Sequence, residues 1–91
     1  MITRNLRITG RVQGVFYRDW FVEQARGIGI TGWVRNRADG SVEAVVSGSS
    51  EMIAAAVAKA RQGSPASRVD DVVVSEVAEE LFDAFGKRPT V

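Results

Sequence analysis

Arg18 and Asn36 are the two residues whose types and surroundings could do chemistry in this sequence. Arg18 closes a short stretch containing Gly10 and Gly14, which runs from a strand-like segment into a segment with helical spacing. A guanidinium binds two oxygens of one phosphate group. Backbone N–H groups at the start of a helix also favour negative charge. This stretch is therefore a candidate cradle for one phosphoryl group.

The same stretch also has an ordinary structural interpretation. Glycine at a strand-to-helix turn commonly provides a positive φ or close packing, and an arginine early in a helix is commonly a solvated surface residue. The stretch lacks the Lys-Ser/Thr pair of a P-loop and the third glycine of the dinucleotide motif. It is too small for ATP but adequate for one phosphoryl group.

Asn36 lies in a second distinctive stretch, Gly32-Trp33-Val34-Arg35-Asn36-Arg37-Ala38-Asp39-Gly40. An asparagine before a turn often caps that turn, but its amide offers both a donor and an acceptor. If Asn36 faces Arg18, it could hold a water molecule in line with a bound phosphoryl group. The flanking Arg35 and Arg37 either add positive potential at the mouth of the site or are ordinary exposed strand residues.

Composition limits the classes of function. We expect residues 1–91 to form one domain, with 45% hydrophobic residues, 25% charged residues and a net charge of +1. This balance gives no electrostatic case for binding nucleic acid or a membrane. No apolar run approaches the roughly 20 residues that span a bilayer, and residues 1–4 do not resemble a signal peptide. We therefore expect a cytoplasmic protein that binds neither nucleic acid nor a membrane. Separately, we expect it to be a monomer.

The sequence contains no cysteine and no histidine. The first absence excludes disulfides and thiol nucleophiles, and the two together exclude the commonest metal ligands. Without histidine, the commonest general base is missing as well. Any enzyme here must use arginine, carboxylates, amides, hydroxyls and backbone N–H groups.

Residue spacing predicts the elements that position these side chains. Alternating apolar residues indicate strands, and apolar residues three and four apart indicate helices. Asp39-Gly40 is a strong hairpin signal between two of the strands, and Phe16, Trp20 and Phe21 are expected in the core. The expected strands are 5–11, 30–37, 42–47 and 69–77, with a possible short one over 81–85; the expected helices are 17–26 and 49–62.

This order is strand, helix, strand, strand, helix, strand. It predicts an α/β protein of the α+β sandwich kind, with the ferredoxin-like βαββαβ order. We expect an antiparallel sheet with two helices on one face and with the first and third strands in its middle. The fold alone does not identify a function, because it hosts enzymes, RNA binders and metal carriers.

Three stretches carry a close resemblance to a known family: Gly10-Arg11-Val12-Gln13-Gly14-Val15-Phe16-Tyr17-Arg18, Gly32-Trp33-Val34-Arg35-Asn36, and Asp39-Gly40-Ser41-Val42-Glu43. In these stretches the sequence resembles the acylphosphatase family. The resemblance continues in Gly63-Ser64-Pro65 and Val69, and so covers nearly the whole chain. One departure lies at the end, where Ala84 takes a position that is often aliphatic and residues 86–91 form an extra segment. We expect that segment to be a frayed tail.

The resemblance implies a hydrolase that cleaves the carboxyl-phosphate bond of small acyl phosphates without a metal or cofactor. It implies that Arg18 binds the phosphate and that Asn36 positions the attacking water. It also implies that the loop backbone cradles the phosphate through Gly10, Arg11, Val12, Gln13, Gly14, Val15 and Phe16. Inorganic phosphate and sulfate should then compete with substrate. No second motif identifies the acyl group.

Other functions stay open on the residues alone. One alternative is a non-catalytic ferredoxin-like module that binds an acyl or carbamoyl phosphate. A single-stranded RNA binder on this topology would need aromatic residues on the central strands, and the segment Leu6-Arg7-Ile8-Thr9 has none. A metal carrier would have only carboxylates as side-chain ligands, so we discard it.

Overall fold

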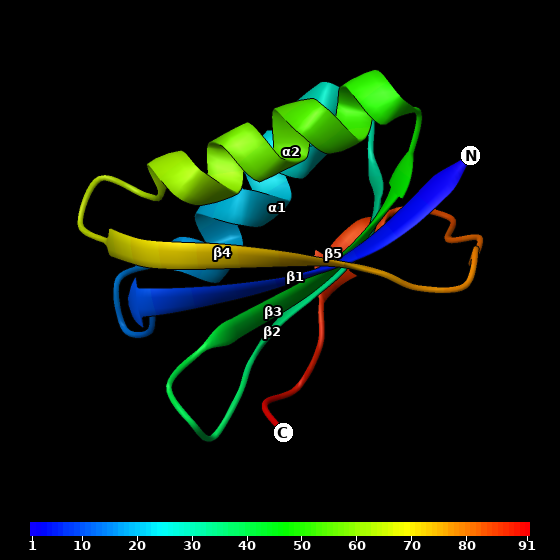
Figure 1. Ribbon diagram of the computed structural model, residues 1–91. Helices are drawn as coiled ribbons and strands as arrows, with labels where there is room; N and C mark the ends of the chain where they lie inside the picture. The colour runs from blue at the N-terminus through cyan, green and yellow to red at the C-terminus, as the bar shows by residue number, and fades with distance from the viewer.

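The computed structural model describes residues 1–91 as five strands and two helices (Figure 1). In chain order these are β1 (Ile2–Arg11), α1 (Tyr17–Ile28), β2 (Thr31–Asn36), β3 (Val42–Gly48), α2 (Ser50–Gln62), β4 (Arg68–Glu76) and β5 (Phe85–Lys87). The strand order across the sheet is β4-β1-β3-β2-β5, with both helices on one face. The predicted ferredoxin-like order is confirmed. Neither helix is long and apolar enough to cross a membrane.

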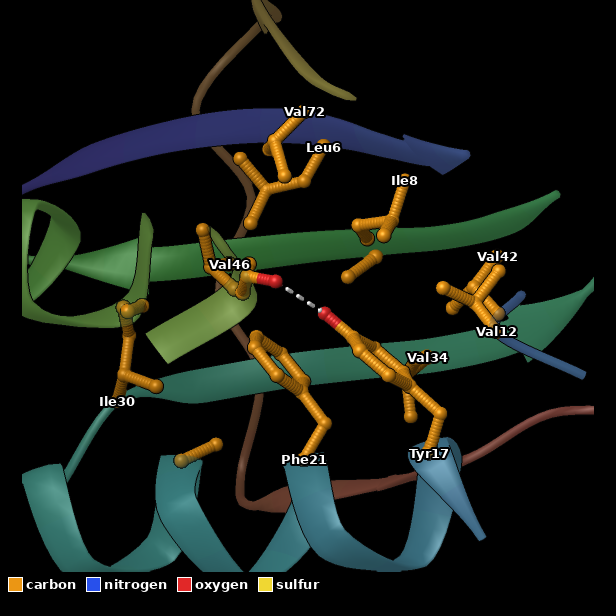
Figure 2. Close-up of a cluster of buried hydrophobic side chains, with 14 of the residues drawn as sticks. Leu6, Ile8, Val12, Tyr17, Phe21, Ile30, Val34, Val42, Val46 and Val72 are labelled. Atoms are coloured by element: carbon orange, nitrogen blue, oxygen red, sulfur yellow. Dashed lines mark hydrogen bonds between the residues drawn. The ribbon is translucent and has the colours of Figure 1, made fainter. Parts of the chain in front are cut away.

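The core lies between the sheet and the two helices. Leu6 and Ile8 of β1 point to this side because strand side chains alternate between faces, and both are fully buried. Figure 2 shows Tyr17 and Phe21 extending from α1 onto the sheet. The Tyr17 hydroxyl donates a hydrogen bond of 2.8 Å to the carbonyl oxygen of Ala60, which ties α1 to α2. Burial raises the pKa of Tyr17 well above its ordinary value, so this donor stays protonated.

The helix ends differ slightly from the prediction. Helix α1 continues past Gly27 to Ile28 and ends at Gly29, which has a φ of 89°. The backbone N–H of Gly29 donates to the carbonyl oxygens of Ala25 and Arg26, as expected for a left-handed glycine cap. Helix α2 begins as the sequence indicates, because the Ser49 side chain accepts a hydrogen bond from the backbone N–H of Met52.

The expected antiparallel pairing is confirmed for the four long strands but does not extend to the short fifth strand at one edge. Strand β5 runs parallel to β2, so the sheet is mixed. The fifth strand also starts at Phe85 rather than over 81–85. Phe85 is buried against Phe21, with ring centroids 5.7 Å apart, whereas Leu81 is exposed. The apolar contact of Phe85 therefore decides which part of this segment pairs with β2.

The segment after β5 is not frayed. The backbone N–H of Arg88 donates to the carbonyl oxygen of Val34 at 2.9 Å, and the N–H of Val91 donates to that of Asn36 at 3.3 Å. The N–H of Ala38 donates in turn to the carbonyl oxygen of Val91 at 2.7 Å. The edge of β2 has backbone groups that need partners, and the end of the chain supplies them. This pairing also holds the backbone of Asn36.

A buried carboxylate, Glu43, lies on the sheet face opposite the helices. It accepts hydrogen bonds from Asn5 at 2.8 Å and from Arg35 and Arg37 at 2.9 Å each. Arg35 and Arg37 are therefore neither free cations at the mouth of the site nor ordinary exposed residues. They bind Glu43 and fix the β2–β3 hairpin next to Asn36.

We expect Glu43 to make stability depend on acid pH. Burial raises the pKa of Glu43, but the hydrogen bonds from Asn5, Arg35 and Arg37 outweigh burial and lower it from 4.5 to about 2. The unfolded chain therefore binds this proton more readily, and the stabilisation present above pH 4.5 is lost as the pH falls toward 2. Urea unfolding of wild type and Glu43→Gln measures this effect. The stability difference between them should shrink over that range, and a constant difference would contradict the prediction.

Candidate active site

The loop between β1 and α1 turns sharply because two of its residues have positive φ. Gly14 has a φ of 72° and Phe16 a φ of 58°. A Cβ on Gly14 would meet nothing within 4 Å, so it is the backbone conformation rather than crowding that favours glycine there. Phe16 occupies the N-cap position of α1 without a side-chain hydrogen bond. The loop therefore brings residues 12–16 close to the first turn of the helix.

The backbone N–H groups of residues 12–19 donate no hydrogen bond to any protein acceptor. The first one that does is the N–H of Trp20, which donates to the carbonyl oxygen of Phe16 at 3.1 Å. Free N–H groups in a loop and a helix N-terminus together form the kind of site that binds anions. The structure thus provides the cluster of backbone donors that the glycine pattern indicates.

A pocket of about 320 Å³ lies at this helix start. It brings Arg18 of α1 and Asn36 of β2 to one site, although they are far apart in the sequence. The residues lining it are Val12, Gly14, Phe16, Tyr17, Arg18, Asp19 and Asn36. The condition set by the sequence, that Asn36 must lie near Arg18, is met.

Arg18 has no ion-pair partner within the protein, and its guanidinium donates no hydrogen bond to a protein acceptor. Arg4, Arg7, Arg35, Arg37 and Arg68 all form ion pairs. The carboxylate next to it in sequence, Asp19, is instead bound by Lys87 at 2.6 Å. The hydrogen bond from Lys87 is the main reason that the pKa of Asp19 is lowered. The charge of Arg18 is therefore available to a ligand in the pocket.

Asn36 is the last residue of β2, and its Cα pairs with that of Val42 on β3. Its Oδ1 atom is buried and accepts no hydrogen bond from the protein. A buried acceptor without a partner is costly, and native structures rarely keep one without a reason. Strand β2 thus holds Asn36, and the Oδ1 atom remains free to accept a hydrogen bond from a polar group in the pocket.

Four of the predicted loop residues do not line this pocket. Gly10 and Arg11 belong to β1, where Gly10 follows a shift in the register with β4. The side-chain amide of Gln13 donates to the carbonyl oxygens of Arg37 and Ser41 at 2.7 and 2.9 Å, so it holds the β2–β3 turn against the loop. Val15 is buried, and its carbonyl oxygen accepts a hydrogen bond of 3.1 Å from Ser64.

The sequence reasoning missed two residues that line the pocket, Tyr17 and Asp19, and misplaced one side chain. Asp19 lines the pocket, and its only sequence signal is that it follows Arg18 in the first helical turn. The expectation that Phe16 lies in the core is wrong, because 81% of it is exposed. Its left-handed backbone places it outside the helical stripe that buries Tyr17 and Phe21.

Fold and pocket together define a small α+β sandwich protein with a cationic, amide-lined pocket at the start of its first helix. The family model described as acylphosphatase matches residues 4–86, and the chain belongs to this family, whose members hydrolyse acyl phosphates. It is 49% identical to an acylphosphatase of Rhizorhabdus wittichii, covering 99% of this chain and 91% of that one. It is 47% identical to an acylphosphatase of Rhodospirillum rubrum over the full length of both. The crystal structure of acylphosphatase from Bacillus subtilis superposes with a TM-score of 0.93 at 34% identity, covering 97% of this chain and 99% of that one.

Proposed function

We propose that Arg18 and the free backbone N–H groups of residues 12–19 bind the phosphoryl group of an acyl phosphate, and that Asn36 positions the water that attacks it. The observation that carries this proposal is the shared pocket of Arg18 and Asn36, with its unpaired backbone donors. Phosphoryl transfer needs positioning and charge stabilisation above all. A guanidinium and a cluster of unpaired N–H groups in one pocket provide both.

In the proposed reaction the buried Oδ1 of Asn36 accepts a hydrogen bond from the attacking water. The water oxygen forms a bond to phosphorus while the bond from phosphorus to the carboxyl oxygen breaks on the opposite side. The proton of the water passes to a phosphoryl oxygen, so the products are a carboxylate and inorganic phosphate. The carboxylate is a good leaving group and needs no acid to protonate it.

The rate should depend little on pH between about 6 and about 8, because no protein group in the pocket titrates there. A guanidinium group does not titrate in this range, and the hydrogen bond from Lys87 lowers the pKa of Asp19, so that its carboxylate stays ionised. A pH profile of kcat/KM with benzoyl phosphate tests this. A bell centred near pH 7 would indicate a carboxylate with a raised pKa acting as base.

Inorganic phosphate and sulfate should inhibit competitively, since both present the same oxygens to Arg18 and the loop. Initial rates at several inhibitor concentrations distinguish the modes. A raised KM with unchanged kcat is the expected result. Non-competitive inhibition would indicate that the anions bind elsewhere.

The first experiment is phosphate release from benzoyl phosphate by the wild-type chain, with a chelator present. Turnover under these conditions supports the proposed mechanism. No turnover by well-folded protein would favour a module that binds acyl phosphates without cleaving them. We further propose that the protein acts as a monomer, since one chain supplies the whole pocket, and sedimentation velocity tests this.

A further inference from the structure

We propose that the Phe16 side chain forms a binding subsite for the acyl group and makes this enzyme favour acyl phosphates with an aromatic acyl group. The inference rests on the proposed function, because it takes the phosphoryl group to be bound at Arg18. It adds a substrate class, which neither the loop motif nor the asparagine motif specifies.

Phe16 has an unfavourable backbone conformation and an exposed side chain. It is the only residue other than glycine with a positive φ, at 58°. This conformation is costly for a residue with a bulky side chain, whereas glycine or asparagine adopts it more readily. The ring gains no core packing in return, because 81% of the residue is exposed. The position therefore keeps a strained, solvent-facing aromatic residue where a less strained one would fit.

Among the apolar residues that line the pocket, only Phe16 has surface left for a ligand. Val12 and Tyr17 are each only 1% exposed, so the core already covers their side chains. The remaining side chains around the pocket are Arg18, Asp19 and Asn36, which are polar. An apolar acyl group that emerges from the pocket can therefore lose water-exposed surface only against the Phe16 ring.

The neighbouring hollow offers no comparable apolar surface. It lies between α1 and β5, has a volume of about 350 Å³, and shares Asp19 with the pocket. Its other lining residues are Val22, Glu23, Arg26, Gly86 and Lys87. Charged side chains dominate this hollow, so an aromatic acyl group is better placed on the Phe16 side of the pocket.

The roles of Phe16 and Asn36 are compatible in the proposed reaction. Asn36 comes from β2 and holds the water, whereas Phe16 comes from the loop at the helix start. In-line attack places the water and the leaving carboxylate on opposite sides of phosphorus. The pocket thus has separate groups for the attacking water and for the departing acyl chain.

The test compares kcat/KM for benzoyl phosphate and acetyl phosphate in wild type, Phe16→Asn, Phe16→Leu and Leu81→Asn. Asparagine tolerates a positive φ, so Phe16→Asn keeps the loop while removing the apolar ring. The ratio of benzoyl to acetyl kcat/KM should fall about fivefold to tenfold in this variant and less in Phe16→Leu. Leu81 is equally apolar and 76% exposed but lies outside the pocket, so Leu81→Asn should leave the ratio unchanged.

Melting temperatures provide a second readout, which distinguishes a ring that binds the acyl group from a ring that stabilises the fold. Relief of the strained backbone should raise the Tm of Phe16→Asn by about 4 °C. A ratio that changes by less than twofold in Phe16→Asn would overturn the proposal, and so would a lowered Tm, which would show that the ring stabilises the fold. If wild type hydrolyses neither substrate, the proposed function itself fails, which is a different result from an unchanged ratio.

Discussion

Replacing Arg18 by alanine is expected to lower kcat/KM for benzoyl phosphate by two to three orders of magnitude or more. Loss of a charge-assisted contact made by two guanidinium nitrogens in a confined pocket costs on the order of 3–5 kcal/mol. Binding of inorganic phosphate should weaken by a comparable factor, since the proposed contact of Arg18 with the phosphoryl group is made in the ground state too. Initial rates and the inhibition constant of phosphate measure the two effects.

The structure supports a large effect because Arg18 is the only cationic residue that lines the pocket. Lys87 is engaged with Asp19 at 2.6 Å, and Arg35 and Arg37 are both bound to Glu43. Arg18→Lys should recover only part of the activity, because an ammonium group does not contact two oxygens in the planar geometry of a guanidinium.

The matched control is Arg61→Ala. Arg61 lies in the last turn of α2, is exposed, and does not line the pocket. This variant changes the net charge by the same amount, so it separates the local role of Arg18 from a general change in charge. Equal activity of Arg18→Ala and Arg61→Ala would mean that the loop is only a turn.

The order of elements was predictable because it depends on local signals. Asp39-Gly40 indicates the hairpin, Ser49 caps a helix, and alternation in β1 indicates the buried face. The prediction that Arg18 begins a helix after a loop of free N–H groups follows from the same local chemistry. The position of Arg18 near Asn36 depended on the topology of the sheet, which the βαββαβ order specifies.

Other features depended on contacts between distant segments. Phe16 belongs by spacing to the same aromatic cluster as Trp20 and Phe21, but its positive φ moves it out of the core. The last strand is placed by the contact of Phe85 with Phe21 and by the open edge of β2. Neither residue spacing nor propensity describes such contacts, which explains why the parallel pairing was not predicted.

Replacing Asn36 by alanine should lower kcat by about 100-fold or more while leaving the inhibition constant of phosphate within about twofold. The proposed role of Asn36 concerns the water and not the phosphoryl group, so binding and turnover should separate. Arg18→Ala should weaken both, and the pair of variants thereby assigns the two roles.

Stability measurements show whether Asn36 is simply a structural residue. Its buried Oδ1 has no partner in the protein, so alanine removes an unsatisfied group and should leave the free energy of unfolding unchanged or raise it by about 1 kcal/mol. The control is Gln62→Ala at the exposed end of α2, which removes an amide that does not line the pocket. Normal turnover by Asn36→Ala would exclude the positioning of water, and a large loss of stability would assign the residue to the fold. A slow but stable enzyme that still binds phosphate would instead indicate that the protein keeps a costly buried amide because the attacking water needs it.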